Sequence, residues 1–510
     1  MKNVKKIIAA LCASTMVVGT LAACGSEEVK KEESKASEKV EESKVETSKE
    51  QPSEEKKEDI TLTWYFLGDT TDVGNEEVFA LASDMVYEKL GFHVNFMPID
   101  YSSYGDKIQM IIAGGEDYDI CWTSNWKNDY ATNVSNGAFL KLDDLLDEVP
   151  DLKASMTEDF WSGALVNGGI YGVPVQQIAA RGAYLRIPEV LYEKYEDTLQ
   201  DIDSFVDLSD YMAAYGADYP DTGNVSFNWA NLSYAYGIEE PLGARMPGAV
   251  MYEGPEDEIE VFNQFATDEF RELVLTRREW TEKGYTLKGS DGASGVAAES
   301  TPEGMPVAVG AYKPSVEIEE AAVLGYPVKA IRLGEGYLSA GGIQATLNAI
   351  SAQSKHPVEA LQLLEYVNTD PEIINLLVYG IEGKHYVKLD EKHVKSVENT
   401  EYNKDSWVLG NVFNTYLIEG QADDTWEQTR EINNTAKASR LMGFSLDTEP
   451  IKLQMANCKS VIDEYFERLD KGTDDSAALL DEMLKKLEEA GVNEIVAELQ
   501  SQIDAWLATK

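Results

Sequence analysis

The sequence is poor in cysteine and histidine. Of its 510 residues, four are Cys and four are His. After residue 60 the cysteines are Cys121 and Cys458, which are too few for a disulfide scaffold and do not form a CxxC pair. The histidines show no metal-ligand spacing. The sequence therefore predicts no disulfide framework, no metal site and no cofactor, and it leaves open whether the two cysteines are free.

Basic charge is scarce relative to acidic charge. The chain has 44 Lys and Arg against 91 Asp and Glu, which gives a formal net charge of −47. A surface this acidic repels a phosphate backbone and an anionic membrane face. We therefore expect no nucleic-acid partner and interpret the excess as a solvated acidic surface.

Recognisable catalytic motifs are absent. The sequence has no GxxxxGK[ST], no HExxH and no GxSxG, so phosphate-loop, zinc-protease and serine-hydrolase chemistry lose support. A glycosidase needs only two carboxylates ~5 to 10 Å apart, and nothing in the sequence singles out such a pair. We expect no catalytic residues and no enzyme, with a cell-surface glycan-degrading enzyme left as an alternative.

A long apolar run occurs once, at residues 7–23, after Lys2, Lys5 and Lys6. It is short for a membrane-spanning helix, which needs ~20 residues, and its layout is that of a secretory signal peptide. The LAAC motif that ends at Cys24 resembles the lipobox of bacterial lipoproteins. This predicts a signal peptide over residues 1–23 and a diacylated Cys24, since two acyl chains anchor stably. The alternative is an ordinary signal peptide with an incidental cysteine.

Residues 24–59 are rich in Glu and Lys and contain no aromatic residue. Such a segment cannot bury enough apolar surface to offset the entropy of ordering it. We expect a disordered acidic tether that follows the lipidated cysteine and holds the rest of the chain away from the membrane.

From residue 60 the pattern alternates between strand and helix. Residues 60–68, 93–99 and 117–122 read as strands, and residues 76–91 and 106–115 read as helices that end in glycine. This order is typical of a parallel sheet with right-handed crossovers. Ligands bind such sheets beyond the carboxyl ends of the strands, which selects the loops GDTTD and TSNWKND.

The later parts of the chain have further landmarks. GGIYGVPVQQ, residues 168–177, suggests a crossing between two lobes, and a second mixed strand and helix segment follows it. Near the C-terminus, residues 476–491 and 492–508 each place apolar side chains on one helical face. We expect these helices to pack on each other or on the second lobe.

These landmarks carry a resemblance to a known family. EDYDICWTSNW, NGAFLKLDDLL, GGIYGVPVQQ, MPVAVGAY, YLSAGGIQAT and HPVEALQLLEYVNTD, in this order after a lipobox, resemble extracellular solute-binding lipoproteins of ABC importers. The nearest group is the maltose-type carbohydrate binders. SRLMGFSLDTEPIKLQMANCKSVIDEYFERLDKG and the helices after it resemble the C-terminal domain of unknown function of one subgroup.

The resemblance implies an α/β, two-lobed periplasmic-binding-protein-like fold (type II) with a helical C-terminal extension. It implies crossings near Val173, Tyr326 and Thr346. Lobe 1 would consist of residues 60–173 plus 326–349, lobe 2 of 174–325 plus 350–440, and a C-terminal helical domain of 441–510 would pack on lobe 2.

The resemblance also implies a function. The protein would be a monomer held by its lipid on the extracellular face of the bacterial cell membrane. It would close two lobes around a carbohydrate, an oligosaccharide above all, and deliver it to the permease subunits of an ABC transporter. The alternatives are a receptor for peptides or modified amino acids, and an adhesion or sensory protein of the same fold.

Sugar sites place aromatic faces against pyranose rings and amides or charged groups against hydroxyls. The candidate loops supply both kinds of group. Trp64 and Trp122 could equally be core residues, Arg181 could pair with a surface carboxylate, and Trp126, with polar neighbours, is the least core-like tryptophan. The predicted ligand-binding residues are Trp64, Tyr65, Asp69, Trp122, Ser124, Asn125, Trp126, Gln176, Gln177, Arg181, Tyr312, Trp407 and Asn411.

Overall fold

The computed structural model describes residues 60–287, 301–400 and 402–510, all of which belong to one compact unit of the chain. The predicted signal peptide, Cys24 and the tether lie outside the described residues. Within these ranges, no helix combines the length and the apolar character that crossing a membrane requires. Short 3-10 turns connect the main elements: η1 (Leu146–Glu148), η2 (Glu196–Thr198), η3 (Val206–Leu208), η4 (Gln264–Ala266), η5 (Val412–Asn414) and η6 (Glu449–Ile451).

The first sheet has five strands in the order β2-β1-β3-β12-β6. β1 pairs in parallel with β2 and β3, and β12 pairs antiparallel to β3 and β6. The parallel part, with a helix between successive strands, is the arrangement that the sequence predicts. The strands are β1 (Thr61–Leu67), β2 (His93–Ile99), β3 (Ile120–Thr123), β6 (Gly172–Pro174) and β12 (Leu347–Ile350).

Local sequence accounts for these elements. Along β1, Leu62, Trp64 and Phe66 are fully buried and alternate with more exposed residues, as a strand with one covered face requires. The helix between β1 and β2 ends at Gly91, which has φ +83° and whose N–H donates to Tyr87 O. A residue without Cβ takes this left-handed conformation at low cost.

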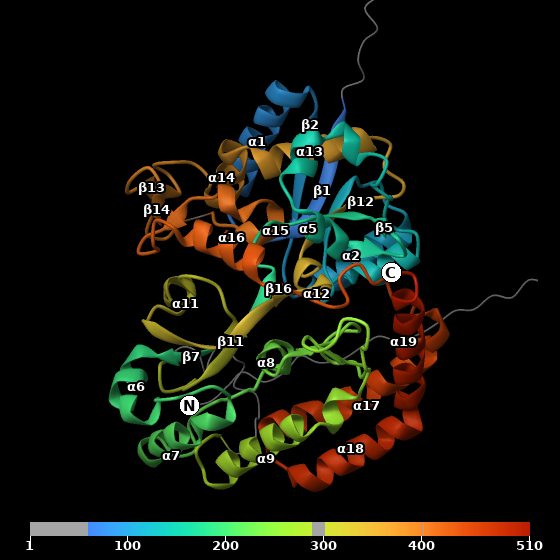
Figure 1. The fold of residues 1–510 in the computed structure, drawn as a ribbon. Coiled ribbons are helices and arrows are strands. Elements are labelled where there is room, and N and C mark those ends of the chain that lie inside the picture. Colours follow the sequence, from blue (N-terminus) through green and yellow to red (C-terminus); the bar gives the residue numbers. More distant parts are fainter. Residues whose placement is uncertain (1–59, 288–300, 401) are drawn as a thin grey trace, which may run out of the picture. The chain divides into compact units, whose positions relative to one another are not determined.

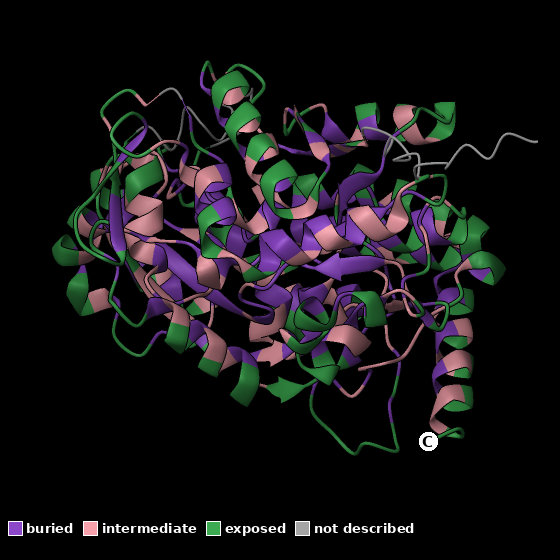
Figure 2. Cartoon of the chain, turned by 90° about the horizontal axis from the view of Figure 1, so that it is seen from above, coloured by how far each residue is buried: buried purple, intermediate pink, exposed green. Residues whose placement is uncertain are grey.

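Helices cover the first sheet and form one hydrophobic core with it. Figure 2 shows buried strands between helices whose outer faces are exposed. The short hairpin β4 (Leu165–Val166) and β5 (Gly169–Ile170) follows the early helices. The helices of this lobe are α1 (Asn75–Leu90), α2 (Tyr104–Gly114), α3 (Tyr130–Ser135), α4 (Pro150–Ala154), α5 (Glu158–Gly163), α13 (Pro357–Thr369), α14 (Pro371–Tyr379) and α15 (Ser406–Leu409).

The position of α13 to α15 corrects the predicted lobe boundary. The prediction assigns residues 350–440 to lobe 2, but Leu361, Leu364, Ile374 and Val408 are buried in the first core. β12 brings the chain back into the first sheet, and α13 starts only seven positions after it ends. The shortest way to cover the apolar faces of α13 and α14 is therefore the sheet to which β12 belongs.

The second sheet has the order β10-β7-β11-β16. It corrects the predicted crossing near Tyr326, because the strand that follows this residue pairs antiparallel with β7 and stays in lobe 2. The small ribbon β8 (Ile238–Glu239) with β9 (Val250–Met251) lies in the same half of the chain. The strands are β7 (Ala180–Pro188), β10 (Ala308–Ala311), β11 (Val328–Leu338) and β16 (Lys437–Ala438).

A separate hydrophobic core joins this sheet to its helices and to the C-terminal region. The C-terminal helices α17 (Lys452–Lys471) and α18 (Ser476–Ala490) pack against α9, and α19 (Val492–Leu507) packs against α17 and α18 (Figure 1). The other helices of lobe 2 are α6 (Glu189–Lys194), α7 (Ser209–Asp218), α8 (Trp229–Ala235), α9 (Asp268–Glu282) and α11 (Val316–Leu324).

The two large cores and the two largest sheets make this a two-lobed α/β fold. The chain passes between the lobes after β6, again between β11 and β12 through the short helix α12 (Ala340–Ile343), and a third time just before β16. Hydrogen bonds tie the crossings together. Asn433 Oδ1 accepts from the N–H groups of Ala179 and Ala180, and Ser439 N donates to Leu338 O at 2.7 Å.

A third, small sheet stands before the last crossing. Its strands are β13 (Tyr386–Lys388), β14 (His393–Ser396) and β15 (Leu417–Ile418), and the helix α16 (Thr425–Thr435) leads from it to β16. α16 is held on this side of the molecule, since Trp426 Nε1 donates to Thr415 O at 2.8 Å.

Candidate ligand site

Three predicted tryptophans meet at the carboxyl ends of the first sheet. The ring centroids of Trp122 and Trp126 are 5.3 Å apart, those of Trp122 and Trp407 6.0 Å, and those of Trp126 and Trp407 6.3 Å. Trp122 lies in β3, Trp126 in the loop after it, and Trp407 in α15. The fold therefore brings together side chains from segments that are far apart in the sequence.

Tyr101 completes this group and was missed in the sequence analysis. Its ring stacks on Trp126 with centroids 5.9 Å apart and an interplanar angle of 29°. Tyr101 is 55% exposed and Trp126 46% exposed. Its position in the sequence could have identified it, because Tyr101 lies in the loop after β2 and so also at a carboxyl end of the sheet. We call Tyr101, Trp126 and Trp407 the aromatic platform.

The loop after β3 determines how Trp126 is presented. Ser124 Oγ accepts from the backbone N–H groups of Trp126 and Lys127, at 3.3 and 2.9 Å, and donates to Lys127 O at 2.7 Å. The indole Nε1 of Trp126 donates to Ala345 O at 2.8 Å. Because the N–H group has its acceptor inside the protein, Trp126 offers a ligand an aromatic face rather than a hydrogen bond.

Lys127 adds a positive charge to the platform. Its Nζ donates to Tyr101 O at 2.7 Å and lies 4.1 Å from the centroid of the Tyr101 ring, in a cation–π arrangement. Partial burial raises the pKa of Tyr101, and the negative charge of Asp405 adds to the effect. Tyr101 is therefore a neutral hydroxyl donor at physiological pH.

Asn125 connects the platform to the second crossing. Its Nδ2 donates to Gly341 O, in α12, at 2.9 Å. A Cβ added at Gly341 would lie 3.7 Å from Asn125 Nδ2 and 3.9 Å from the Tyr234 hydroxyl. Asn125 of lobe 1 and Tyr234 of lobe 2 thus flank the same turn of the chain.

Arg181 lies beside this turn, at the start of β7. Its Nε is buried and has no hydrogen-bond partner among the described residues. A Cβ on Gly342 would come within 3.2 Å of Arg181 Cγ and 2.1 Å of Ala179 O, so no side chain fits at this position. The alternative that Arg181 pairs with a surface carboxylate does not hold, since no ion pair of this residue is present in the described part.

Trp64, Trp122 and Ser124 are structural, which corrects the ligand contacts predicted for them. All three are completely buried. Trp64 Nε1 donates to Asn348 Oδ1 at 3.1 Å, and Trp122 Nε1 donates to Thr346 Oγ1 at 2.7 Å. Trp122 supports the platform from below, and Ser124 shapes the loop.

Gln176 and Asn411 require the same correction. Gln176 Nε2 donates to Ser155 Oγ at 3.0 Å. Asn411 Nδ2 donates to Asn368 O at 3.2 Å, and its Oδ1 accepts from Phe413 N at the start of η5. Both are nearly buried, and their amide groups fasten backbone segments near the crossings.

Tyr65 and Asp69 follow β1 as predicted but have local contacts. Tyr65 packs edge-on against Tyr118, and burial, with the charge of Glu116, raises its pKa. Asp69 is exposed, and its carboxylate accepts from the hydroxyl and the N–H of Thr71. These two hydrogen bonds lower the pKa of Asp69. The Asp69 carboxylate is therefore charged and stabilises the loop in which it lies.

Tyr312 and Gln177 lie apart from the platform. Tyr312 packs under Arg332, whose guanidinium is 4.8 Å from the ring centroid. Gln177 is half-buried, and its carbonyl accepts from Asn433 Nδ2 at 2.7 Å. Of the predicted set, Asn125, Trp126, Arg181 and Trp407 are therefore the side chains that remain around the second crossing.

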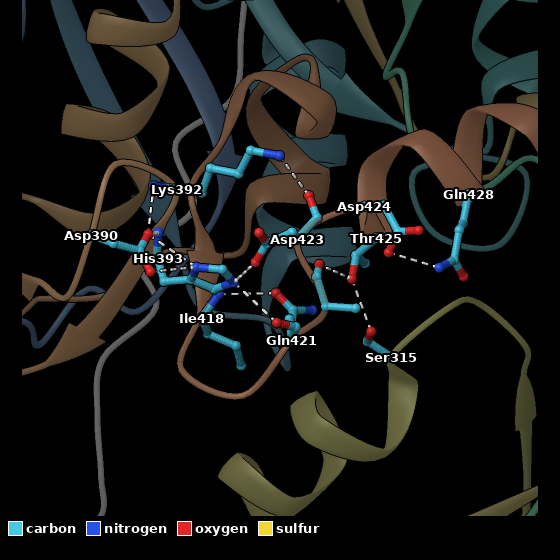
Figure 3. Close-up of polar contacts among 11 residues, drawn as sticks. Ser315, Asp390, Lys392, His393, Ile418, Gln421, Asp423, Asp424, Thr425 and Gln428 are labelled. Carbon is cyan, nitrogen blue, oxygen red and sulfur yellow. Dashed lines mark hydrogen bonds and ion pairs between the residues drawn. The ribbon is translucent and has the colours of Figure 1, made fainter.

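A second bridge between the lobes lies at α11. Ser315 Oγ is 2.9 Å from Thr425 Oγ1, and Gln421 Nε2 donates to Glu319 Oε1 at 3.0 Å. Figure 3 shows how His393 holds this loop: its Nδ1 lies 3.0 Å from the Asp390 carboxylate and its Nε2 lies 3.0 Å from Gln421 O.

The C-terminal region matches a known family. Residues 440–508 match the family described as a domain of unknown function (DUF3502). This range contains α17, α18 and α19, in the place where the sequence analysis found the resemblance to such a domain.

Most of the chain is similar to a carbohydrate ABC transporter substrate-binding protein of Streptococcus pneumoniae serotype 4. The two are 27% identical over 462 residues, which cover 88% of this chain and 91% of that protein. The N-glycan transport solute-binding protein NgtS of Streptococcus pneumoniae has a similar structure, with a TM-score of 0.78, 24% identity, and coverage of 88% of this chain and 99% of NgtS.

An extracellular solute-binding protein of Bifidobacterium longum subsp. infantis shares the fold at 14% identity and a TM-score of 0.60, over 88% of this chain and 98% of that one. The predicted type II fold and the family resemblance are confirmed. The chain has the fold of these solute-binding proteins, is similar in sequence to one of them, and carries a C-terminal region that matches DUF3502. Its relatives are named as binding and transport proteins, which agrees with the prediction that it is not an enzyme.

Proposed function

We propose that the protein captures an oligosaccharide between its two lobes and delivers it to an ABC transporter. The observation that carries the proposal is the aromatic platform. The side chain of Trp126 is large and mostly apolar, yet it is 46% exposed. Its indole N–H already donates to Ala345 O. What remains is an apolar face, which suits the C–H face of a pyranose ring.

The relatives support a carbohydrate. One is named as a carbohydrate ABC transporter substrate-binding protein. NgtS has been crystallised with Man5GlcNAc and with Man1GlcNAc, and the solute-binding protein FusA of Streptococcus pneumoniae has been crystallised with kestose. These ligands belong to those proteins, and together they indicate which class of compound to test first.

A peptide or modified amino acid is the less favoured ligand. Its termini would need fixed charges of both signs at the site, and Asp69 is the acidic side chain of the predicted ligand-binding set. The Asp69 carboxylate is instead engaged by Thr71, so the described site supplies aromatic surface and donors rather than a paired set of charges.

The remaining parts of the proposal concern location. Cleavage before Cys24 and its diacylation would hold the protein on the outer face of the bacterial cell membrane through lipid alone. Residues 25–59 would act as a tether, and a monomer would present the loaded lobes to the permease subunits. Cys24→Ala should release the protein or leave its leader uncleaved, and a normal diacyl modification in that variant would contradict the anchor.

A thermal-shift experiment tests the ligand class. The mature protein is heated with Man5GlcNAc, Man1GlcNAc, kestose, maltotriose or a tripeptide. A ligand at 100 times its dissociation constant adds about 2.7 kcal/mol to the free energy of unfolding, which raises the melting temperature by several degrees. We expect at least one of the glycans to do so, and a shift with the peptide but with none of the glycans would overturn the proposal.

A further inference from the structure

In lobe 2, the rings of Tyr234, Tyr252 and Tyr337 form a stack next to the second crossing. The rings of Tyr234 and Tyr252 are stacked with centroids 6.0 Å apart and an interplanar angle of 21°, and those of Tyr252 and Tyr337 are 4.3 Å apart at 2°. Tyr252, in the middle, is almost fully buried, whereas Tyr234 at one end is half-buried. Tyr234 is therefore held rigidly from one side and keeps part of its surface accessible.

Arg181 lies next to this stack of tyrosine rings. It is the β7 residue that lies opposite Tyr337 in the β7–β11 ladder. Burial raises the pKa of Tyr234, while the positive charge of Arg181 opposes the rise and the charges of Glu240 and Glu239 add to it. Arg181 and Tyr234 also lie beside neighbouring residues of α12, since a Cβ added at Gly342 would lie 3.2 Å from Arg181 Cγ and one added at Gly341 would lie 3.9 Å from the Tyr234 hydroxyl.

Arg181 differs from the other arginines of this protein. Each of the others makes a hydrogen bond, an ion pair or a ring contact, although the Nε atoms of Arg332 and Arg440 are also buried without a hydrogen-bond partner among the described residues. The chain has twice as many acidic as basic residues, so a carboxylate partner would be easy to supply. A buried donor without an acceptor costs free energy, and such an orphan group calls for an explanation.

We infer that Tyr234 and Arg181 form a second sugar subsite, in which a neutral oxygen acceptor of the ligand, a hydroxyl or an acetamido carbonyl, satisfies Arg181 while a ring edge packs on Tyr234. The inference rests on the proposed function and deepens it. Neutral chemistry fits because the chain as a whole is strongly acidic. A carboxylate on the ligand would meet this negative potential.

The position of the subsite indicates the size of the ligand. Gly341 in α12 lies between Asn125, next to the aromatic platform, and Tyr234, in the subsite. A ligand that touches both Trp126 and Tyr234 must extend across α12. This favours a chain of sugar units over a monosaccharide. It also means that residues of lobe 2 contact the ligand directly when the lobes close.

Calorimetric titration of the mature protein tests the inference. The variants are Arg181→Gln, Arg181→Lys, Tyr234→Leu and Tyr234→Phe, with Arg332→Gln as the matched control, because Arg332 lies in the same sheet but pairs with Glu335. The probes are Man5GlcNAc, Man1GlcNAc and an alginate trisaccharide as the acidic ligand. Melting temperatures without ligand show which variants fold. If Arg181→Gln or Tyr234→Leu does not fold, the more conservative Arg181→Lys or Tyr234→Phe takes its place.

We expect Arg181→Gln and Tyr234→Leu to weaken binding of the larger glycan by tenfold or more, and Arg332→Gln to change it by less than threefold. Arg181→Lys should still lose several-fold, because an ammonium group does not place a donor where Nε lies. Wild-type affinity in folded Arg181 and Tyr234 variants, with a loss in Trp126→Ala, would overturn the subsite and leave the proposed function standing. Tighter binding of the alginate probe than of the neutral glycans would overturn its neutral character, and wild-type binding of no glycan would overturn the proposed function itself.

Discussion

Trp122 and Trp126 are four positions apart and have different surroundings. Trp122 is completely buried, and its indole N–H donates to Thr346, whereas Trp126 is 46% exposed and stacks with Tyr101. The end of β3 lies between them. The same side chain thus contributes to the core on one side of this boundary and offers a surface to a ligand on the other.

The first prediction concerns Trp126. In Trp126→Ala the affinity for a bound glycan should fall by ~2 kcal/mol or more, as for a binding hot spot, with little change in the melting temperature without ligand. Trp122→Ala should instead lower the free energy of unfolding by ~3 to 5 kcal/mol. Titration and urea unfolding measure the two quantities. Trp161→Ala is the control, because this indole lies in α5 and donates to Lys153 O; equal affinity loss in it and in Trp126→Ala would argue against stacking.

The second prediction concerns Glu239, which is 7% exposed and accepts a hydrogen bond from Ser439 Oγ. Burial raises the pKa of Glu239 from its ordinary value of 4.5 to about 7, against the effect of Ser439 and Arg440. The folded chain therefore holds this proton more tightly than the unfolded chain. Its stabilising contribution is complete below pH 4.5 and is lost as the pH rises to about 7.

The loss should amount to about 3 kcal/mol in the free energy of unfolding. Urea unfolding at pH 5 and pH 8 measures it. Glu239→Gln, which stays neutral, should show a smaller decrease over this range than the wild type, and Glu488→Gln, exposed on α18, should follow the wild type. An unchanged pH dependence in Glu239→Gln would contradict the assignment.

At the scale of elements, α16 acts as a clamp on the first crossing. Asn433 Oδ1 accepts from Ala179 N and Ala180 N at 2.9 and 3.0 Å, and Nδ2 donates to Gln177 O at 2.7 Å. One buried amide thus satisfies three backbone groups of the segment that leads into β7.

The third prediction follows from this clamp. Asn433→Ala leaves buried backbone groups without partners, each of which costs ~1 to 3 kcal/mol, so the free energy of unfolding should fall by ~2 kcal/mol or more. Asn433→Asp keeps the acceptor and should lose less. The neighbouring Asn434 is exposed, and Asn434→Ala serves as the control in urea unfolding. Equal stability of the two alanine variants would show that the crossing does not depend on Asn433.

At the scale of the whole molecule, the DUF3502 region is part of the core of lobe 2. The ring of Phe466 in α17 lies 5.5 Å from that of Phe227 and 6.1 Å from that of Phe270. The region also touches lobe 1, since Asn167 N in the turn between β4 and β5 donates to Ser445 Oγ at 2.5 Å.

The fourth prediction is that lobe 2 and the C-terminal helices unfold together. Phe466→Ala should cost ~3 to 5 kcal/mol and shift their common calorimetric transition to lower temperature. Leu453→Ala, at an exposed position of the same helix, should leave the transition in place. A separate low-temperature transition for the C-terminal helices, with lobe 2 unaffected, would contradict a shared core.

The fifth prediction concerns motion of the lobes. Two cores joined by crossings should move as near-rigid bodies, so a saturating glycan should lower the radius of gyration in solution scattering. Trp126→Ala at the same glycan concentration should show a smaller decrease. Identical scattering curves of the wild type with and without bound glycan would argue against closure.

Part of this architecture could be predicted from the sequence because it depends on local patterns. Alternating apolar residues marked β1, and the glycine at position 91 marked the end of α1, where the structure has φ +83°. The rule on carboxyl ends of strands led to the loop that contains Trp126. It would also have led to Tyr101 had the loop after β2 been included.

The tertiary structure alone decided which lobe each later segment joins. The pattern of residues 325–333 favours a strand and that of residues 355–380 favours helix, but this strand pairs with β7 in lobe 2 and the helices pack in lobe 1. It also decided that Trp407 meets Trp126 and that Tyr234 and Arg181 lie across α12 from them. Local periodicity predicts that one face of a helix or strand is buried, but it does not predict in which core. Both cores offer the same apolar surroundings, so the lobe that a segment joins depends on the path of the chain through the crossings.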